Sequence, residues 1–379
     1  MIAGILFGFA PLAIWLYLVL GRNFFWLLRE RDDKPAPIPA RWPSIVAVVP
    51  ARDEADVISR SIGSLLAQDY PGDFHIILVD DLSSDGTGDI ARGMAHNHLT
   101  VLTGAPRPPG WTGKLWAMQQ GIERANAYHA PDYLWFTDAD IAHSSDNLRQ
   151  LAARAGEGDT VLVSLMAKLH SRSSAEHFLI PAFVYFFAML YPFAAVNNAR
   201  RRIAAAAGGC MLARRAALEA AGGIAAIRGS IIDDCALARA MKKEGPIWLG
   251  LTNRATSLRP YEHIGDIRHM VSRSAYAQLG YSPLLLVGTL LALALVFFAA
   301  PAAALFGWGI SQGAAWGAWL LMAISFQPML RFYRLSPLWG LALPIIAGFY
   351  AAFTLESAIQ HGRGRGGMWK GRAQAGGAP

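Results

Sequence analysis

The sequence predicts an α/β domain built on a mostly parallel sheet, with apolar helices on its N-terminal and C-terminal sides. Two observations predict this fold class. Short apolar runs alternate with amphipathic segments through the first half of the chain. Charged residues make up only 16% of the 379 residues, against about 25% in an ordinary soluble domain, and they are absent from long windows near both ends.

The alternation can be followed element by element. Apolar runs at 44–52, 74–81, 99–104, 133–141 and 160–169 are predicted strands, and the segments 56–68, 86–97, 114–127 and 146–157 between them are predicted helices. Ligands bind parallel sheets of this kind at the carboxyl ends of the strands. Asp80/Asp81 and Asp138/Asp140 each end a predicted strand, so we expect both pairs at one edge of the sheet.

The apolar windows predict an integral membrane protein. Segments with the composition of a spanning helix lie at Ile2–Leu20, Pro283–Leu305, Ala314–Leu330 and Leu338–Leu355. Three full spans at the C-terminal side would place the basic tail outside, against the positive-inside rule, so the total stays open between three and four. The predicted division is an anchor at 1–22, a cytosolic domain at 42–280, a transmembrane block at 282–357 and a basic tail at 358–379.

The basic residues follow the same pattern. The formal net charge is +7, and much of the surplus lies beside the apolar windows. Attraction to anionic lipid headgroups explains this placement, so nucleic acid is not a predicted partner. The basic flank after the first window predicts an uncleaved anchor with the large domain in the cytoplasm.

The aromatic segment at 178–197 is long enough for one more span. Aspartate pairs lie on both sides of it in the sequence, and one site cannot lie on both faces of a bilayer. We therefore predict an interfacial or re-entrant element, the alternative being a buried helix of the domain. Its aromatic side chains would lie at the headgroup level and contact an acceptor: Phe183, Tyr185, Phe186, Phe187 and Tyr191.

Two aspartates one residue apart raise the question of a cation. Asp138 and Asp140 would share a face of an extended chain, and like charges so close repel unless something positive lies between them. A divalent metal or water alone are the alternatives. Lys114 lacks the spacing of a phosphate-binding loop, but its place near the sheet edge predicts contact with a diphosphate, with a solvated lysine as the alternative.

Two further groups are candidates for chemistry. Asp233 and Asp234 directly precede a predicted helix, and two carboxylates are more than a helix cap needs. One of them could act as a general base if burial raised its pKa toward neutrality. Arg273 precedes the membrane block, where it is either a positive-inside flank or a cation for a diphosphate leaving group.

Over residues 44–280 the sequence resembles the family 2 inverting glycosyltransferases with the GT-A fold. "VVPARDEADVISRSIGSLLAQDYP", "LVDDLSSDGT", "TDAD" and "IIDDCALA" carry the resemblance in this order. It implies that Asp138 and Asp140 bind Mg²⁺ or Mn²⁺ and that Asp234 is the catalytic base. It also implies nucleotide-sugar contacts from Pro50, Arg52, Glu54, Asp81, Lys114, Asp138, Asp233 and Arg273.

A narrower resemblance is to the membrane-anchored branch that includes ceramide glucosyltransferase, and within it to the hopene-associated glycosyltransferases of bacterial hopanoid clusters. "GWTGKLWA", "RSAYAQLGYSPLLL" and "RGRGGMWKGR" carry it. It implies transfer of one sugar from a nucleotide-diphospho sugar, with a UDP-sugar as the expected donor. The implied acceptor is a membrane lipid, a hopanoid or related polyprenoid, and the implied location is the bacterial inner membrane.

The (Q/R)xxRW motif of processive and ceramide-type members is not intact. Ser274 stands in place of its Trp and Met270 in place of its leading residue, and the tail at 369–372 is a candidate for the missing aromatic and cation. This departure disfavours a processive polysaccharide synthase. A catalytically silent membrane scaffold is the third hypothesis, and the intact aspartates argue against it. The sequence indicates no oligomeric state.

Overall fold

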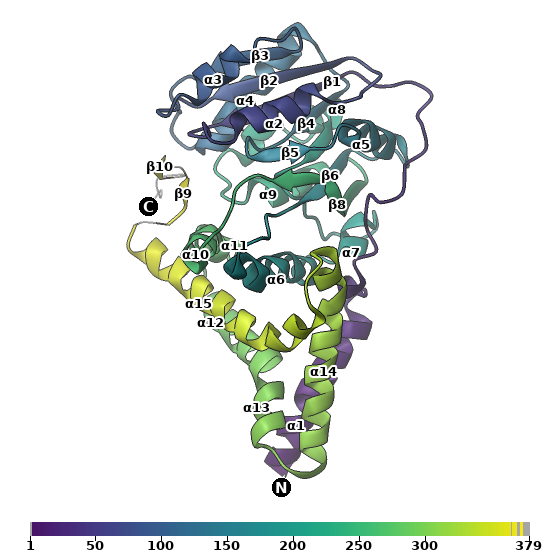
Figure 1. Cartoon of the computed structure of the whole chain (residues 1–379), viewed down its shortest axis with the longest axis vertical. Helices are drawn as coiled ribbons and strands as arrows, with labels where there is room; N and C mark the ends of the chain where they lie inside the picture. The colour runs from purple at the N-terminus through teal and green to yellow at the C-terminus, as the bar shows by residue number, and fades with distance from the viewer. Residues whose placement is uncertain (1, 365, 370–371, 374–379) are drawn as a thin grey trace. The chain divides into compact units, whose positions relative to one another are not determined.

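The computed structural model describes residues 2–364, 366–369 and 372–373, and it divides into two compact units (Figure 1). The sheet unit comprises Glu30–His170, Ala195–Pro260 and Gly367–Pro379, and the helical unit comprises Met1–Arg29, Ser171–Ala194 and Tyr261–Gly366. The predicted cytosolic domain at 42–280 includes Ser171–Ala194 and the start of Tyr261–Gly366. In the structure both segments lie in the helical unit, where their helices pack against the apolar helices near the C-terminus.

The sheet unit is built on one eight-stranded sheet. Its spatial order is β3-β2-β1-β4-β7-β6-β8-β5. The strands are β1 (Ile45–Ala51), β2 (Phe74–Asp80), β3 (Leu99–Thr103), β4 (Tyr133–Phe136), β5 (Ile141–His143), β6 (Leu162–Lys168), β7 (Met211–Arg214) and β8 (Ile247–Ser257). A separate pair joins β9 (Met368–Trp369) to β10 (Arg372–Ala373).

The sheet is mixed rather than mostly parallel. Strands β3, β2, β1 and β4 are parallel neighbours, as predicted. In the other half, β7 is antiparallel to β4 and to β6, and β5 is antiparallel to β8, while β6 and β8 are parallel. The predicted strands of this first half are confirmed. Burial on both faces explains the continuous apolar runs of β1, β4 and most of β2, whereas β3, at the edge of the sheet, is only partly buried.

The helices of the sheet unit cover both faces of the sheet. They are α2 (Ile58–Leu66), α3 (Thr87–Gly93), α4 (Gly113–Tyr128), α5 (Asn147–Gly156), α8 (Arg215–Ala220) and α9 (Asp233–Met241), with α7 (Phe193–Asn197) at the boundary of the two units. Side chains of α2 and α5 share a buried core with Ala47 and Val49 of β1. On α4, Gly121 lies against Val48, which points to the opposite face of β1.

Close packing at Gly121 predicts opposite effects for two glycine substitutions. A Cβ at Gly121 would lie 2.4 Å from Val48 Cγ1, so Gly121→Ala should lower the free energy of unfolding by about 1–3 kcal/mol. At Gly63 of α2 the nearest atom is 4.0 Å away, so Gly63→Ala should raise it by about 0.5–1 kcal/mol. Denaturant unfolding of the purified variants checks both signs, and equal stabilities would contradict this packing.

The predicted strand at 133–141 is wrong in its second half. β4 ends at Phe136, the chain turns through Asp138 and Asp140, and β5 then pairs with β8 at the far edge of the sheet. Thr137 helps to fix the turn, because its Oγ1 donates a hydrogen bond to the carbonyl of Gly209 at 3.0 Å. The two aspartates therefore lie in a loop at the carboxyl end of β4 rather than on one face of a strand.

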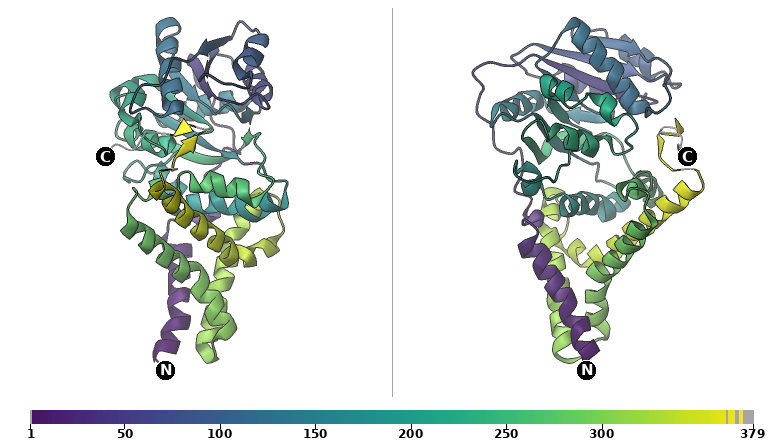
Figure 2. Two further views of the ribbon diagram at one scale, coloured as in Figure 1. Left: turned by 90° about the vertical axis from the view of Figure 1, so that its left-hand side faces the viewer. Right: turned by 180° about the vertical axis from the view of Figure 1, so that it is seen from behind.

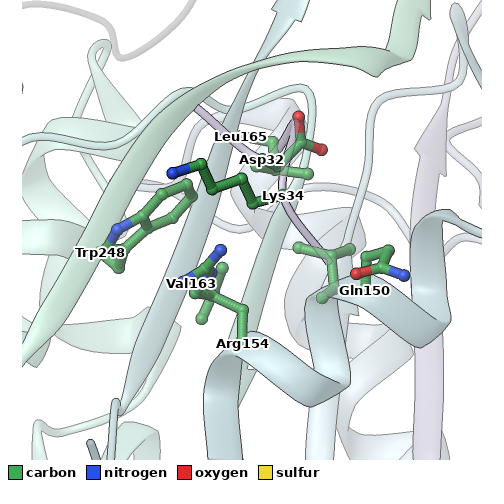
Figure 3. A pocket seen from close by; sticks show the side chains of 8 residues that line it. Asp32, Lys34, Gln150, Arg154, Val163, Leu165 and Trp248 are labelled. Carbon is green, nitrogen blue, oxygen red and sulfur yellow. The ribbon is translucent and has the colours of Figure 1, made fainter. Parts of the chain in front are cut away.

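A small cavity lies beside the segment that enters the sheet unit. Asp32 N donates to the carbonyl of Leu251 on β8 at 3.1 Å, and Asp32 Oδ2 accepts from Thr252 Oγ1 at 2.6 Å. The cavity has a volume of about 10 Å³ and is lined by Asp32, Lys34, Gln150, Leu151, Arg154, Val163, Leu165 and Trp248 (Figure 3). None of the strand-end aspartates lines it, so it is not part of the candidate site.

The helical unit contains two helices that are long and apolar enough to cross a membrane, among the residues that the structure describes. They span Pro283–Phe306 and Pro337–Gly362. The first predicted window gives a shorter apolar helix at Gly8–Gly21, and the third lies in α14, which is not one of the two. The unit's helices are α1 (Ile2–Leu16), α6 (Ser174–Leu190), α10 (Ile264–Ser272), α11 (Ala275–Gln278), α12 (Pro283–Leu293), α13 (Ala299–Phe306), α14 (Gly309–Phe332) and α15 (Leu343–Gly362). Within this unit α1 and α14 run side by side (Figure 2).

The aromatic side chains of α6 pack into the helical unit. Tyr185 is fully buried, and its hydroxyl lies 2.7 Å from Ser325 Oγ on α14. Phe186 packs edge-on against Phe297 and Tyr350. Tyr185 therefore cannot reach lipid headgroups or an acceptor, in contrast to the expectation from the sequence, because its ring completes this aromatic core.

Candidate active site

Lys114 joins two aspartates that are distant in the sequence. It lies in the first turn of α4, after Thr112, whose Oγ1 caps the helix by accepting from Leu115 N. Its Nζ lies 2.8 Å from Asp138 Oδ1 and 3.0 Å from Asp233 Oδ2. Burial opposes the charge of Lys114, but the two carboxylates raise its pKa well above the usual range. Lys114 therefore carries a proton and holds the loop after β4 against the start of α9.

Asp234 lies beside this ion-pair group but makes different contacts. Its Oδ2 accepts from Gly208 N at 3.0 Å, and its Oδ1 accepts from Cys235 N at 2.6 Å. A Cβ at Gly208 would lie 3.2 Å from Lys114 Nζ and 3.6 Å from Asp234 Oδ2. A glycine at position 208 thus allows the backbone to approach the lysine and the aspartate together.

Burial shifts the acid equilibria of this group. It raises the pKa of Asp234 to about 6; the charge of Asp233 also raises it, while Lys114 and the two backbone N–H groups lower it. Burial likewise raises the pKa of Asp138, against the lowering effect of Lys114, and the charge of Asp140 raises it further. A carboxylate with a pKa near 6 is ionised at neutral pH yet basic enough to accept a proton.

Arg259 forms a second ion-pair group that the sequence analysis missed. It lies two residues after β8, and its Nη2 is 2.8 Å from each carboxylate oxygen of Glu54. Its Nε donates to Asp140 Oδ2 at 2.9 Å. The run at 247–257 begins with the short apolar stretch Ile247–Leu251, and assigning it as a strand would have placed Arg259 beyond a strand end.

Only some of the nucleotide ligands predicted from the first two strands lie at the sheet edge. Asp81 is fully buried, and the Arg52 guanidinium lies 3.8 Å from its Oδ2, so no ligand can contact this carboxylate in the observed conformation. Pro50 lies within β1 opposite Val79. Glu54 is brought to the edge by its contact with Arg259.

Other predicted residues belong elsewhere in the chain. Arg273 follows α10 in the helical unit. The same unit contains the other predicted acceptor residues, Phe183, Phe186, Phe187 and Tyr191, and the roles of all five residues remain predictions. Lys370 and Gly371 of the tail lie outside the described residues.

A divalent cation could bind beside Asp138 and Asp140 only if a bound ligand supplied further oxygen atoms. Among the described residues, no group of three or more His, Cys, Asp or Glu side chains could hold a metal ion. Mg²⁺ sites, however, commonly use one or two carboxylates together with substrate phosphates. Asp138 and Asp140 are two such carboxylates, and the acids Asp233, Asp234 and Glu54 keep the surroundings negative despite Lys114 and Arg259.

Comparison with known proteins identifies the domain. Residues 46–222 match the family model described as Glycosyl transferase family 2. Residues 46–222, a little under half of the chain, are therefore similar to the family 2 glycosyl transferases. The chain is thus a glycosyltransferase, and the matched range contains Glu54, Lys114, Asp138 and Asp140. No curated protein matches the sequence.

Solved structures show the fold of the glycosyltransferase. The mannosyltransferase PcManGT from Pyrobaculum calidifontis, in complex with GDP-Man and Mn²⁺, superposes with a TM-score of 0.54 at 18% identity, over 93% of this chain and 97% of that one. This similarity supports the predicted GT-A fold. TarS 1-349 from S. aureus, in complex with UDP-GlcNAc, matches at 16% identity and a TM-score of 0.40, over 84% and 92% of the two chains. Mannosyl-3-phosphoglycerate synthase from Rubrobacter xylanophilus matches at 16% identity and a TM-score of 0.39, over 67% and 83%.

Proposed function

We propose that this glycosyltransferase moves a single sugar from a nucleotide-diphospho sugar to a membrane lipid, with inversion at the anomeric carbon. The observation that carries the proposal is the position of Asp234. Its carboxylate is held by two backbone N–H groups, its pKa is raised to about 6, and it lies beside the Lys114 that binds Asp138. A proton acceptor thus lies next to the acids proposed to bind the donor.

The proposed chemistry separates two kinds of acid. Asp234 takes the proton from the attacking hydroxyl of the acceptor. Asp138 and Asp140, with diphosphate oxygens, would hold Mg²⁺ or Mn²⁺, which when bound supplies positive charge for the departing diphosphate. Lys114 forms ion pairs with two carboxylates, so we propose that it positions Asp138 and Asp233 rather than binding the diphosphate itself.

Donor class, metal and acceptor have separate support. PcManGT was solved with GDP-Man and Mn²⁺, which supports a nucleotide sugar and a divalent cation here. The two helices that could cross a membrane support a lipid acceptor and a membrane location, with the sheet unit in the cytoplasm of a bacterial cell. The hopanoid acceptor and the UDP-sugar donor rest on the narrower resemblance of the sequence alone.

The lipids of cells that express the chain test the proposal. Wild-type protein should add one lipid species that is heavier than its precursor by a single sugar residue, detected by mass spectrometry of lipid extracts. Asp140→Asn should abolish this species, because the amide removes a charge from the cation site, whereas Asp69→Asn, which changes an exposed acid bonded to Arg149, should not. A ladder of longer products would indicate a processive synthase, and unchanged lipids would contradict the proposed acceptor.

A further inference from the structure

Arg259 bridges two acids that come from different strand ends. Glu54 lies in the loop after β1, Asp140 in the loop after β4, and Arg259 just beyond β8. The bridge is well shielded, because the side chains of Glu54 and Asp140 are only 10% and 19% exposed and that of Arg259 is 35% exposed. Leu258 N also donates to the main-chain carbonyl of Asp140 at 2.7 Å. The backbone of Leu258 and the side chain of Arg259 therefore both bind Asp140.

We propose that Arg259 is a positioning residue for Asp140 as a cation ligand, and that Glu54 holds Arg259 in its place. The inference rests on the proposed function, in which Asp140 binds the metal. Arg259 Nε donates a hydrogen bond to Oδ2 of Asp140, and no other described residue bonds to this carboxylate. Oδ1 of Asp140 is therefore available to a cation. The planar guanidinium has donors in fixed directions, so its bonds to Glu54 also set the direction of the bond to Asp140.

Glu54 has an electrostatic role in the same arrangement. A guanidinium beside Asp140 by itself would repel an incoming divalent cation. The two bonds of Arg259 to Glu54, each 2.8 Å long, offset that positive charge. The bridge thus orients Asp140 without cancelling the attraction of the loop for a cation.

Substitution of Arg259 by lysine tests the geometry of the bridge separately from its charge. Lysine keeps the positive charge but lacks the separate Nε and Nη2 donors that bind Asp140 and Glu54. We expect Arg259→Lys in the full-length purified protein to weaken Mn²⁺ binding about tenfold, the lower end of the loss seen when a residue that orients a metal ligand is changed. Glu54→Gln should weaken it similarly. The double variant should lose no more than the weaker-binding single variant, because both residues act through one bridge. Because diphosphate oxygens complete the proposed cation site, every sample also contains UDP. The free Mn²⁺ signal in electron paramagnetic resonance, read against a protein-free sample of Mn²⁺ and UDP, then measures binding without any turnover.

Arg254, which lies within β8, offers a matched control. It also bridges two aspartates, with Nε 2.8 Å from Asp146 Oδ2 and Nη1 3.2 Å from Asp32 Oδ2, but neither acid belongs to the candidate site. Arg254→Lys should leave Mn²⁺ binding unchanged. Equal binding by the wild type and Arg259→Lys would overturn the positioning role alone. Weaker Mn²⁺ binding in both Arg259→Lys and Arg254→Lys would mean that the loss comes from general destabilisation, and this result would also overturn the positioning role. Wild-type binding by Asp140→Asn would instead refute the metal role on which the inference rests.

Discussion

Asp234→Asn should reduce release of the nucleoside diphosphate by about 10²–10⁴-fold, the range that general acid–base catalysis supplies. The amide has nearly the shape of the carboxylate but cannot take a proton from the acceptor. Asp233→Asn is the matched control, because Asp233 is the neighbouring acid and is bonded to Lys114 instead of to backbone N–H groups. A larger loss in Asp233→Asn than in Asp234→Asn would move the base to Asp233.

The pH dependence gives the same assignment an independent test. Because the pKa of Asp234 is raised to about 6, the base is ionised above that pH and protonated below it. Nucleotide release by the wild type should therefore fall about tenfold for each pH unit below 6. The residual rate of Asp234→Asn should lack this break. A wild-type rate that is constant from pH 7 to pH 4.5 would exclude Asp234 as the base.

Lys114→Met should impair both stability and turnover. It leaves Asp138 and Asp233 partly buried without their shared cation, and breaking a buried ion pair by removing one partner costs about 3–5 kcal/mol. Because Lys114 lowers the pKa of Asp234, its removal should also move the acidic limb of the pH profile to higher pH. Thermal unfolding and the pH dependence of nucleotide release measure the two effects.

Two further variants serve as controls for Lys114→Met. Lys243→Met changes an exposed residue and should alter the free energy of unfolding by less than about 0.5 kcal/mol. In Lys114→Met/Asp138→Asn one uncompensated charge is gone, so part of the lost stability should return. Wild-type stability of Lys114→Met would mean that the ammonium does not balance these acids.

The first half of the sheet could be predicted from the sequence because its signal is local. Strands such as β1 are buried on both faces, and the helices between them show an apolar face in the sequence itself. The second half depends on pairing between distant segments. β7 has only four residues and is paired on both sides, and β5 is separated from its partner β8 by more than a hundred residues of chain. Short strands of this kind leave little periodicity to detect.

The parts of the candidate site that have a local signal in the sequence could also be predicted, and the parts that depend on distant contacts could not. Aspartates at strand ends predicted an acidic edge, and the structure brings Asp138 and Asp233 together around Lys114 there. That prediction needed only local pattern and a general property of such sheets. Lys114 was expected to contact a diphosphate or water, yet it lies between Asp138 and Asp233. That position depends on α9 meeting α4, a tertiary contact without a local signal. Asp81 was expected to bind a ligand but is buried beside Arg52, another tertiary contact without a local signal.

The loop after β4 is held by one cation at each of its two acids. Lys114 on α4 bonds to Asp138, and Arg259 beyond β8 bonds to Asp140. These cations come from opposite halves of the sheet, so the whole sheet fixes the spacing of the acids before any donor arrives. Preorganisation of this kind reduces the conformational entropy lost on binding. The affinity of the enzyme for its donor should therefore depend on substitutions in the sheet core that touch neither acid.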